Sequence, residues 1–294
     1  MSCTSIFEAH ENLNCVSAFE QLIASSSNSA VNLIKNKTKE GFDYGLEKQY
    51  VISTVNDMSW NIEGELALAR DENLMILRPE VGNISKFDGE HDGAVLCCDW
   101  DPSGTLLVSG SMDERLVLWD PRLEKPAFSA ISAHSDPILD CEFSPDGKSI
   151  VSGSIDGLIR LWDIRTMRCY ATLIDDDNPP VLSVSWSENG KWIIAASIDD
   201  SVRLWEAKKN GRCARQYIGT KFDGKPGVAT LLGPIVIAGG RENGIHAWDA
   251  QSKGMLYSDS TNPVSSLEVF TDDSVISVSG STPFIYMHFL NKFL

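Results

Sequence analysis

Four tryptophans recur at equal steps of 43 residues and constrain the architecture of the whole chain. They are Trp119, Trp162, Trp205 and Trp248, and each ends a short run in which apolar and polar residues alternate. Such alternation is typical of a strand with one buried face, and a fixed period of this size indicates a repeat array. One repeat of this kind is a small sheet that cannot bury its own faces, so we expect neighbouring repeats to stack.

The two best-defined copies share the same internal pattern. They read EHDGAVLCCDWDPSGTLLVSGSMDERLVLWD (residues 90–120) and AHSDPILDCEFSPDGKSIVSGSIDGLIRLWD (residues 133–163). In each copy a histidine stands 28 residues before the tryptophan, and Pro, Ser, Asp and Gly residues fall where hairpins need turns. The copies resemble WD repeats of a β-propeller. A third copy has Asp177 in place of the histidine, and a fourth, which ends at Trp248, is shortened in its first half.

The same register extends beyond the four tryptophans. Further steps reach segments that lack the Trp-Asp signature but keep the strand pattern, so the repeats end near residues 34, 78, 119, 162, 205, 248 and 289. This predicts an all-β fold, a single seven-bladed WD-repeat β-propeller over residues 1–294. The last repeat has no segment of its own for a fourth strand. We expect residues 2–7 to supply that strand and to close the ring.

Composition narrows the classes of function. The net charge of −16, from 41 acidic and 25 basic residues, argues against binding to a nucleic-acid backbone and favours basic peptides as partners. The chain has no apolar run of membrane-helix length and no signal-peptide pattern, so we expect a soluble intracellular protein. Seven cysteines form an odd set without a C-x-x-C pair, which favours reduced core thiols over disulfides or a metal site.

The histidines and acidic residues favour structure over catalysis. Two histidines share fixed offsets with a serine, an aspartate and a tryptophan, which favours hydrogen-bond networks over general bases or metal ligands. The predicted networks are His91, Ser109, Asp113 and Trp119, and then His134, Ser152, Asp156 and Trp162. The three acids at 175–177 lack the spacing of a calcium loop and favour a solvated connection. Phosphate loops, nucleophile elbows and zinc-protease motifs are absent, so we expect no enzyme activity, cofactor or metal.

From about residue 97 to residue 206 the sequence resembles a narrower group. The stretches SGSMDERLVLWD, IVSGSIDGLIRLWD and, above all, TLIDDDNPPVLSVSWSENGKWIIAASIDDSVRLW are similar to the WD-repeat core subunit of trithorax and COMPASS histone lysine methyltransferase complexes. The resemblance implies a nuclear, non-catalytic scaffold, monomeric within a hetero-oligomer. It would hold a SET-domain methyltransferase and a second, retinoblastoma-binding-type WD subunit, with the histone tail as a further ligand and no direct contact to nucleic acid or membrane.

In that family one mouth of the central channel binds an arginine between two aromatic rings. The matching rim positions in this chain are aliphatic or polar: Leu96, Val228, Met112, Ile155, Asn56 and Asp71. Loss of the rings removes cation–π stacking worth about 1 kcal/mol or more. We therefore expect arginine-anchored peptides to bind weakly or not at all, and the rim resembles the fungal type of this subunit more than the animal type.

On the opposite face the family docks a short segment of the second WD subunit. The matching positions are Asn189, Trp192 and Leu204. Trp192 suits an anchor, because large rigid rings dominate the binding energy of many interfaces. The alternative is that Trp192 is one more aromatic side chain that its neighbours partly cover.

The sequence is also compatible with two other functions. The tetrapeptides at 119–122 and 162–165, each of the form W-D-x-R, resemble the motif by which WD-repeat substrate receptors join cullin-based ubiquitin ligases. Arg122 and Arg165 would be the contacts. A further alternative is a propeller that assembles another nuclear, RNA-processing or trafficking complex.

Overall fold

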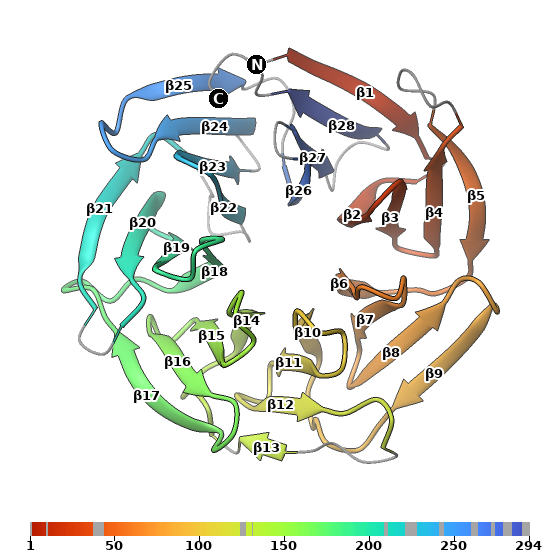
Figure 1. Ribbon diagram of the computed structural model, residues 1–294, viewed down its shortest axis with the longest axis horizontal. Coiled ribbons are helices and arrows are strands. Elements are labelled where there is room, and N and C mark those ends of the chain that lie inside the picture. The colour runs from red at the N-terminus through yellow and green to blue at the C-terminus, as the bar shows by residue number, and fades with distance from the viewer. Residues whose placement is uncertain are drawn as a thin grey trace.

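The computed structural model is a ring of seven four-stranded antiparallel sheets around a central channel (Figure 1). It describes residues 2–9, 11–37, 44–123, 128–130, 132–208, 211–220, 228–240, 244–259, 264–271, 274–278 and 284–289. The regular structure of these residues is all strand, which confirms the all-β, seven-bladed propeller predicted from the repeats. Among the same residues there is no helix that could span a membrane.

Six blades are each built from four consecutive strands, numbered from the inner strand outward. Blade one contains β2 (Leu13–Phe19), β3 (Leu22–Ser27), β4 (Val31–Asn36) and β5 (Tyr44–Tyr50). Blade two contains β6 (Val55–Trp60), β7 (Leu66–Arg70), β8 (Asn73–Arg78) and β9 (Asn83–Phe87). Blade three contains β10 (Val95–Trp100), β11 (Leu107–Ser111), β12 (Leu116–Trp119) and β13 (Phe128–Ala130). Blade four contains β14 (Ile138–Phe143), β15 (Ser149–Ser154), β16 (Ile159–Asp163) and β17 (Arg168–Leu173). Blade five contains β18 (Val181–Trp186), β19 (Trp192–Ser197), β20 (Ser201–Glu206) and β21 (Cys213–Ile218). Blade six contains β22 (Val228–Leu232), β23 (Ile235–Gly240), β24 (Gly244–Asp249) and β25 (Met255–Asp259).

Blade seven is assembled from both ends of the chain. Its inner strands are β26 (Ser266–Thr271), β27 (Ser274–Val278) and β28 (Phe284–Phe289), and its outer strand is β1 (Ser2–Glu8). β1 pairs antiparallel with β28, from Ser2 opposite Phe289 to Glu8 opposite Phe284. The predicted closure of the ring by the N-terminal segment is confirmed, with a strand that ends one residue later than expected.

The apolar core is divided among the seams of the ring. Seven buried clusters each combine residues of two adjacent blades, so every seam is filled. In the seam between blades two and three, for example, Ala67 and Ile76 pack with Val95 and Leu107. This arrangement follows from strand alternation, because each sheet presents apolar side chains on both of its faces and can bury them only against its two neighbours.

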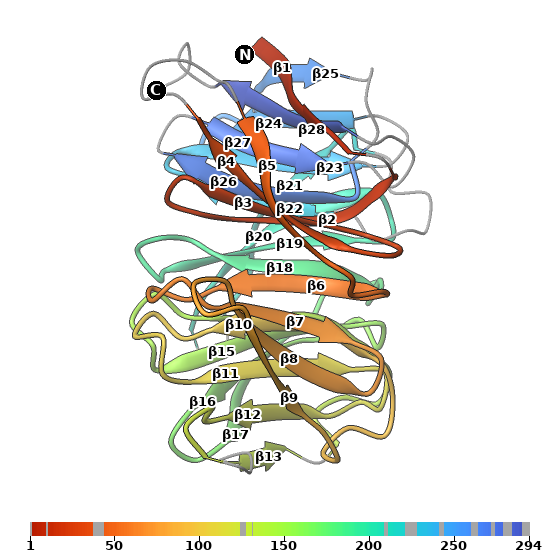
Figure 2. The same cartoon turned by 90° about the vertical axis from the view of Figure 1, so that its right-hand side faces the viewer.

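The two faces of the ring carry different turns, as the side view in Figure 2 shows. On one face lie the turns from the second to the third strand of each blade and the connections that lead to the next blade. We call it the His face, because His91 and His134 lie in two of these connections. The opposite face carries the turns from the first to the second strand and from the third to the fourth strand.

Candidate functional site

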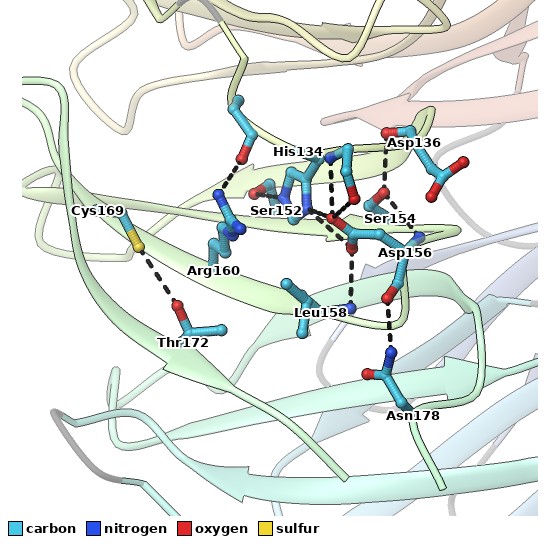
Figure 3. A network of polar contacts seen from close by, with 12 residues as sticks. His134, Asp136, Ser152, Ser154, Asp156, Leu158, Arg160, Cys169, Thr172 and Asn178 are labelled. Carbon is cyan, nitrogen blue, oxygen red and sulfur yellow. Dashed lines mark hydrogen bonds and ion pairs between the residues drawn. The ribbon is translucent and has the colours of Figure 1, made fainter.

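A chain of four buried hydrogen-bonding groups holds the His face of blade four together, and Figure 3 shows its members His134, Ser152 and Asp156. His134 Nδ1 lies 2.9 Å from Asp156 Oδ2, and His134 Nε2 lies 2.8 Å from the Ser152 hydroxyl. The Trp162 indole N–H donates to Ser152 Oγ at 2.9 Å. Since Ser152 accepts from the indole, its own hydroxyl donates to Nε2, and a neutral imidazole then donates from Nδ1 to the carboxylate.

Blade three repeats this geometry around His91. The distances are 3.0 Å from His91 Nδ1 to Asp113 Oδ2, 2.8 Å from Nε2 to Ser109 Oγ, and 2.8 Å from the Trp119 indole nitrogen to Ser109 Oγ. Burial lowers the pKa of His91 and of His134, in opposition to the nearby carboxylates, which raise it. Both rings are fully buried and fully engaged, so neither can act on a substrate at the surface. The networks fix the connections between blades.

Loss of the central hydroxyl should weaken such a network. In Ser152→Ala the Trp162 indole N–H and His134 Nε2 both lose their partner inside the protein, and each buried unsatisfied group costs about 1–3 kcal/mol. We expect the free energy of unfolding in urea to fall by about 1–2 kcal/mol, since local relaxation recovers part of the loss. Ser258→Ala, at an exposed position of the outer strand β25, is the control. Equal stability of the two variants would contradict a structural role for the network.

Blade five replaces the network with a buried arginine. Ala195 stands one repeat after Ser152, and the Trp205 indole N–H has no hydrogen-bond partner among the described residues. Arg203, which is 4% exposed, joins the turn between β19 and β20 to the connection that leads into blade five. Its guanidinium lies 2.6 Å from Asp199 in the turn and 2.8 Å from Asp175 in the connection.

This bridge changes the interpretation of the acidic connection at 175–177. Asp176 and Asp177 are exposed, as expected for a solvated connection, but Asp175 is an ion-pair partner of Arg203. Asn178, which follows the three acids, donates its side-chain amide to the Asp156 carbonyl oxygen at 2.8 Å (Figure 3). The connection is therefore held to blades four and five.

The predicted rim residues surround the channel mouth on the His face. Leu96 and Val228 line the channel, but the two polar residues expected to anchor an arginine are already engaged. Asn56 donates its side-chain amide to the Val95 carbonyl oxygen of the next blade at 2.7 Å. Asp71 forms an ion pair of 2.5 Å with Arg70.

The turns above the rim carry an arc of exposed apolar side chains. Met112 and Ile155, which were expected at this rim, are 54% and 40% exposed. Ile198 occupies the same turn position in blade five and is 39% exposed, although the sequence analysis did not single it out. It could have been found, because these three residues follow one another at the same step of 43 as the tryptophans. We call these three residues the apolar arc.

The channel below the rim is strongly acidic. It has a volume of about 1060 Å³, and its lining contains six carboxyl groups and no lysine, arginine or histidine among the described residues. The six are Asp57, Asp99, Asp140, Glu142, Glu188 and Glu268. Four of them accept a backbone N–H from the inner strand of the next blade, at 2.8–2.9 Å. These carboxyl groups, which the sequence analysis missed, link the inner strands of blades two to five.

On the opposite face the three predicted groove residues differ in exposure. Asn189 is exposed in the turn between β18 and β19, where its side chain accepts from the Lys191 backbone N–H at 2.9 Å. Trp192 is half-buried and packs against the apolar cluster of the seam between blades five and six. Leu204 belongs to that cluster and is 4% exposed, so most of its side chain lies in the seam. Of the three positions that match the groove, Asn189 and Trp192 therefore expose side-chain surface, whereas Leu204 exposes almost none.

The same face carries the two arginines of the W-D-x-R segments. Arg122 is exposed, and its guanidinium is held by Asp120 at 2.6 and 2.7 Å. Arg165 is also exposed, and its charge contributes to lowering the pKa of Asp163. Both follow the third strand of their blade, so they project at equivalent positions of neighbouring blades.

Comparison with known families identifies the repeats. The profile of the family described as "WD domain, G-beta repeat" matches residues 83–120, 125–163 and 167–206. The chain contains WD repeats. Each matched segment runs from the outer strand of one blade to the third strand of the next, so together they contain the first three strands of blades three to five, with the two His networks and the arginine bridge.

Relatives of known name share only short segments with this WD-repeat protein. "WD and tetratricopeptide repeats protein 1" of Mus musculus and of Homo sapiens are each 40% identical over 45 residues, which is 15% of this chain and 7% of theirs. "F-box-like/WD repeat-containing protein TBL1Y" of Homo sapiens is 33% identical over 67 residues, 22% of this chain and 13% of its own. The chain therefore spans a small part of each relative's length, and the likeness indicates shared repeats.

WD-repeat propellers are generally non-catalytic scaffolds. The described residues of this chain contain no group of three or more His, Cys, Asp or Glu side chains that could hold a metal ion. Of the cysteines, Cys15, Cys97, Cys98 and Cys141 are buried, whereas Cys169 and Cys213 are exposed on outer strands.

The acidic channel makes the stability of the propeller depend on pH. Burial, with added repulsion from Asp57 and Asp99, raises the pKa of Glu268 from 4.5 to about 8. The folded state thus holds this proton more tightly than the unfolded chain, and that contribution is lost as the pH rises from about 4.5 to about 8. Burial also raises the pKa of Asp57 to about 6, of Asp99 to about 7 and of Asp140 to about 8.

We expect Glu268→Gln to raise the melting temperature at pH 9 and to leave it unchanged at pH 5. The neutral amide removes the cost of an ionised carboxylate in the channel, and that cost is present only at high pH. Thermal unfolding at both pH values measures the effect, with Glu47→Gln as control because Glu47 is exposed on the outer strand β5, away from the channel. A gain of equal size at both pH values would contradict the electrostatic explanation.

Proposed function

We propose that this WD-repeat propeller is a nuclear, non-catalytic scaffold subunit of a histone lysine methyltransferase complex of the COMPASS type. It would hold the SET-domain enzyme and a second, retinoblastoma-binding-type WD subunit for methylation of the histone tail. The observation that carries the proposal is the resemblance of residues 97–206, with the DDDNPP junction at 175–180 at its centre. The junction is a built element of the propeller, because Arg203 and the Asp156 carbonyl oxygen hold it in place.

The architecture suits this role. Seven filled seams and links between neighbouring inner strands make a stiff ring, which presents its loops at fixed positions on two faces. The match to WD repeats lies in the blades that carry the apolar arc on one face and Trp192 on the other. A single disc could therefore bind two partners at the same time.

On the His face we propose that the apolar arc replaces the aromatic clamp of the family. Met112, Ile155 and Ile198 offer an aliphatic surface, and Asn56 and Asp71 are occupied by Val95 and Arg70. Such a rim favours aliphatic side chains of the methyltransferase or histone tail over an arginine, because stacking on a guanidinium needs rings. This supports the expectation of weak binding to arginine-anchored peptides.

On the opposite face we propose that Trp192 and Asn189 receive the second WD subunit. Trp192 is partly exposed and packs against the apolar cluster that contains Leu204, which suits a rigid anchor. Its half-burial also means that part of the ring contributes to the seam between blades five and six. A substitution at Trp192 therefore needs separate readouts of binding and stability.

The test is purification of the tagged chain from nuclear extract, with the co-purifying proteins identified by mass spectrometry. We expect a SET-domain methyltransferase and a second WD subunit in the wild-type sample. In Trp192→Ala the second WD subunit should be reduced by a factor of 10 or more, on the order of a hot-spot loss of about 2 kcal/mol. Ile62→Ala is the matched control, because Ile62 is exposed in the equivalent turn of blade two and lies away from the proposed groove.

The other outcomes separate the alternatives. Each variant is also melted, because a large fall in melting temperature for Trp192→Ala alone would assign this ring to the core. Recovery of cullin-ligase subunits without a methyltransferase, and their loss on Arg122→Ala with Arg165→Ala, would replace the scaffold proposal by a ubiquitin-ligase substrate receptor. Recovery of components of another complex alone would contradict both.

A further inference from the structure

Two cysteines of neighbouring blades touch each other on the channel wall. Cys97 lies on β10 of blade three and Cys141 on β14 of blade four, inner strands that lie side by side in Figure 1. Their sulfur atoms are 3.2 Å apart, and the two residues are 1% and 2% exposed. Both line the acidic channel. The proposed scaffold function makes no use of them.

The surrounding backbone holds this pair in place. Two residues further along the same strands, Asp99 on β10 accepts the Phe143 backbone N–H of β14 at 2.8 Å, which sets the spacing of the two strands. Gly110 on β11 leaves room for the sulfur atoms, because a Cβ at that position would lie 2.7 Å from Cys97 Sγ. The contact is therefore built by residues of three strands.

We propose that Cys97 and Cys141 are an oxidation site, at which a hydroperoxide converts the two thiols into a disulfide that links blades three and four. A disulfide has its sulfur atoms about 2.05 Å apart, so small rotations of both side chains bring the atoms into bonding distance. The channel gives a small oxidant such as hydrogen peroxide access to the pair without opening the seam. Cys98, the neighbour of Cys97, also lines the channel but packs into the seam between blades two and three, whereas Cys97 and Cys141 pack into the seam between blades three and four.

The chemistry is the ordinary two-step oxidation of a thiol pair. Cys97 sulfur attacks one oxygen of hydrogen peroxide, the O–O bond breaks, and sulfenic acid and water form. Cys141 sulfur then attacks the sulfenic sulfur, the S–O bond breaks, and the hydroxyl leaves as a second water with the Cys141 proton. In total two thiols and one peroxide give one disulfide and two waters. Burial raises the pKa of both thiols, so alkaline pH speeds the reaction.

The test uses the full chain with its exposed thiols removed by Cys169→Ser and Cys213→Ser. The native protein is treated with hydrogen peroxide, the peroxide is destroyed by catalase, and remaining thiols are alkylated in denaturant before proteolysis and mass spectrometry. We expect a peptide pair joined through Cys97 and Cys141, lighter than the two free peptides by two hydrogens and separated by dithiothreitol. The oxidised protein should also melt at a higher temperature than the reduced one, because the link constrains the unfolded chain.

Variants within the pair and beside it make the result specific. Cys141→Ala should abolish the joined peptides, whereas Cys98→Ser should keep them and prove that Cys97 is the linked neighbour. A melting curve for each variant checks that it is folded. Recovery of Cys97 and Cys141 as separate alkylated or sulfinic peptides from folded, peroxide-treated protein would overturn the proposal, and so would a link through Cys98.

Discussion

Deletion of residues 2–8 is expected to lower the melting temperature more than any single core substitution. The deletion removes the whole of β1, and with it the antiparallel ladder to β28 that completes blade seven. It also uncovers the apolar cluster at the seam of blades seven and one, where Ile6 packs with Leu13 and Ile285. Removing the Ile6 side chain alone should cost about 2–5 kcal/mol, and the lost ladder adds to this.

Thermal unfolding followed by circular dichroism measures this effect. Ile6→Ala should reproduce part of the loss, whereas Glu8→Ala, at an exposed position of the same strand, should change the stability by less than about 0.5 kcal/mol. Because the deletion leaves the edge of β28 without a partner, we also expect self-association in size-exclusion chromatography. If the truncated protein and the wild type had the same melting temperature, the ring would not depend on this closure.

Replacement of Arg203 by methionine should produce the second-largest loss. The substitution keeps much of the side-chain volume but leaves Asp175 and Asp199 without their shared partner. Removing one member of a buried ion pair costs about 3–5 kcal/mol. The two carboxylates keep side-chain exposures of 26% and 34%, so water compensates part of the loss and we expect about 2–3 kcal/mol.

Urea unfolding of Arg203→Met alongside Arg122→Met separates a buried from an exposed pair. Arg122 also bridges to an aspartate, but its side chain is 69% exposed, so its loss should cost less than about 1 kcal/mol. We further expect Arg203→Met to loosen the connection at 175–180, which limited proteolysis would detect. Similar small losses in both variants would mean that Arg203 contributes no more than a surface charge.

The repeat spacing carried most of the fold prediction. A tryptophan at every forty-third residue fixes the third strand of four blades, and the remaining positions, down to residue 34 and up to residue 289, lie in the third strands of the other blades. The closing strand was predictable for a physical reason, because a blade with three strands leaves an open edge. The His networks could be proposed from offsets alone, since a fixed register puts residues of equal spacing at equal places.

The interactions that escaped prediction depend on where side chains point in three dimensions. The sequence shows Arg203 only as one polar residue in an alternating strand, and the folded blade is needed to show that it bridges Asp175 and Asp199. Asp57 and Asp99 also fit the alternation, which does not distinguish a solvent-facing residue from one that faces the channel. Leu204 was assigned to the surface by analogy of position, whereas the seam between blades five and six buries it.

The pairing of β1 with β28 has a mechanical consequence. Ser2 lies opposite Phe289, so the two strands leave the ladder at the same end of blade seven. A force that pulls these two residues apart therefore loads one rung at a time, as in a zipper, and never shears all the rungs together. The ladder that closes the ring is therefore weak against tension applied at Ser2 and Phe289, although it joins the two segments of blade seven along their length.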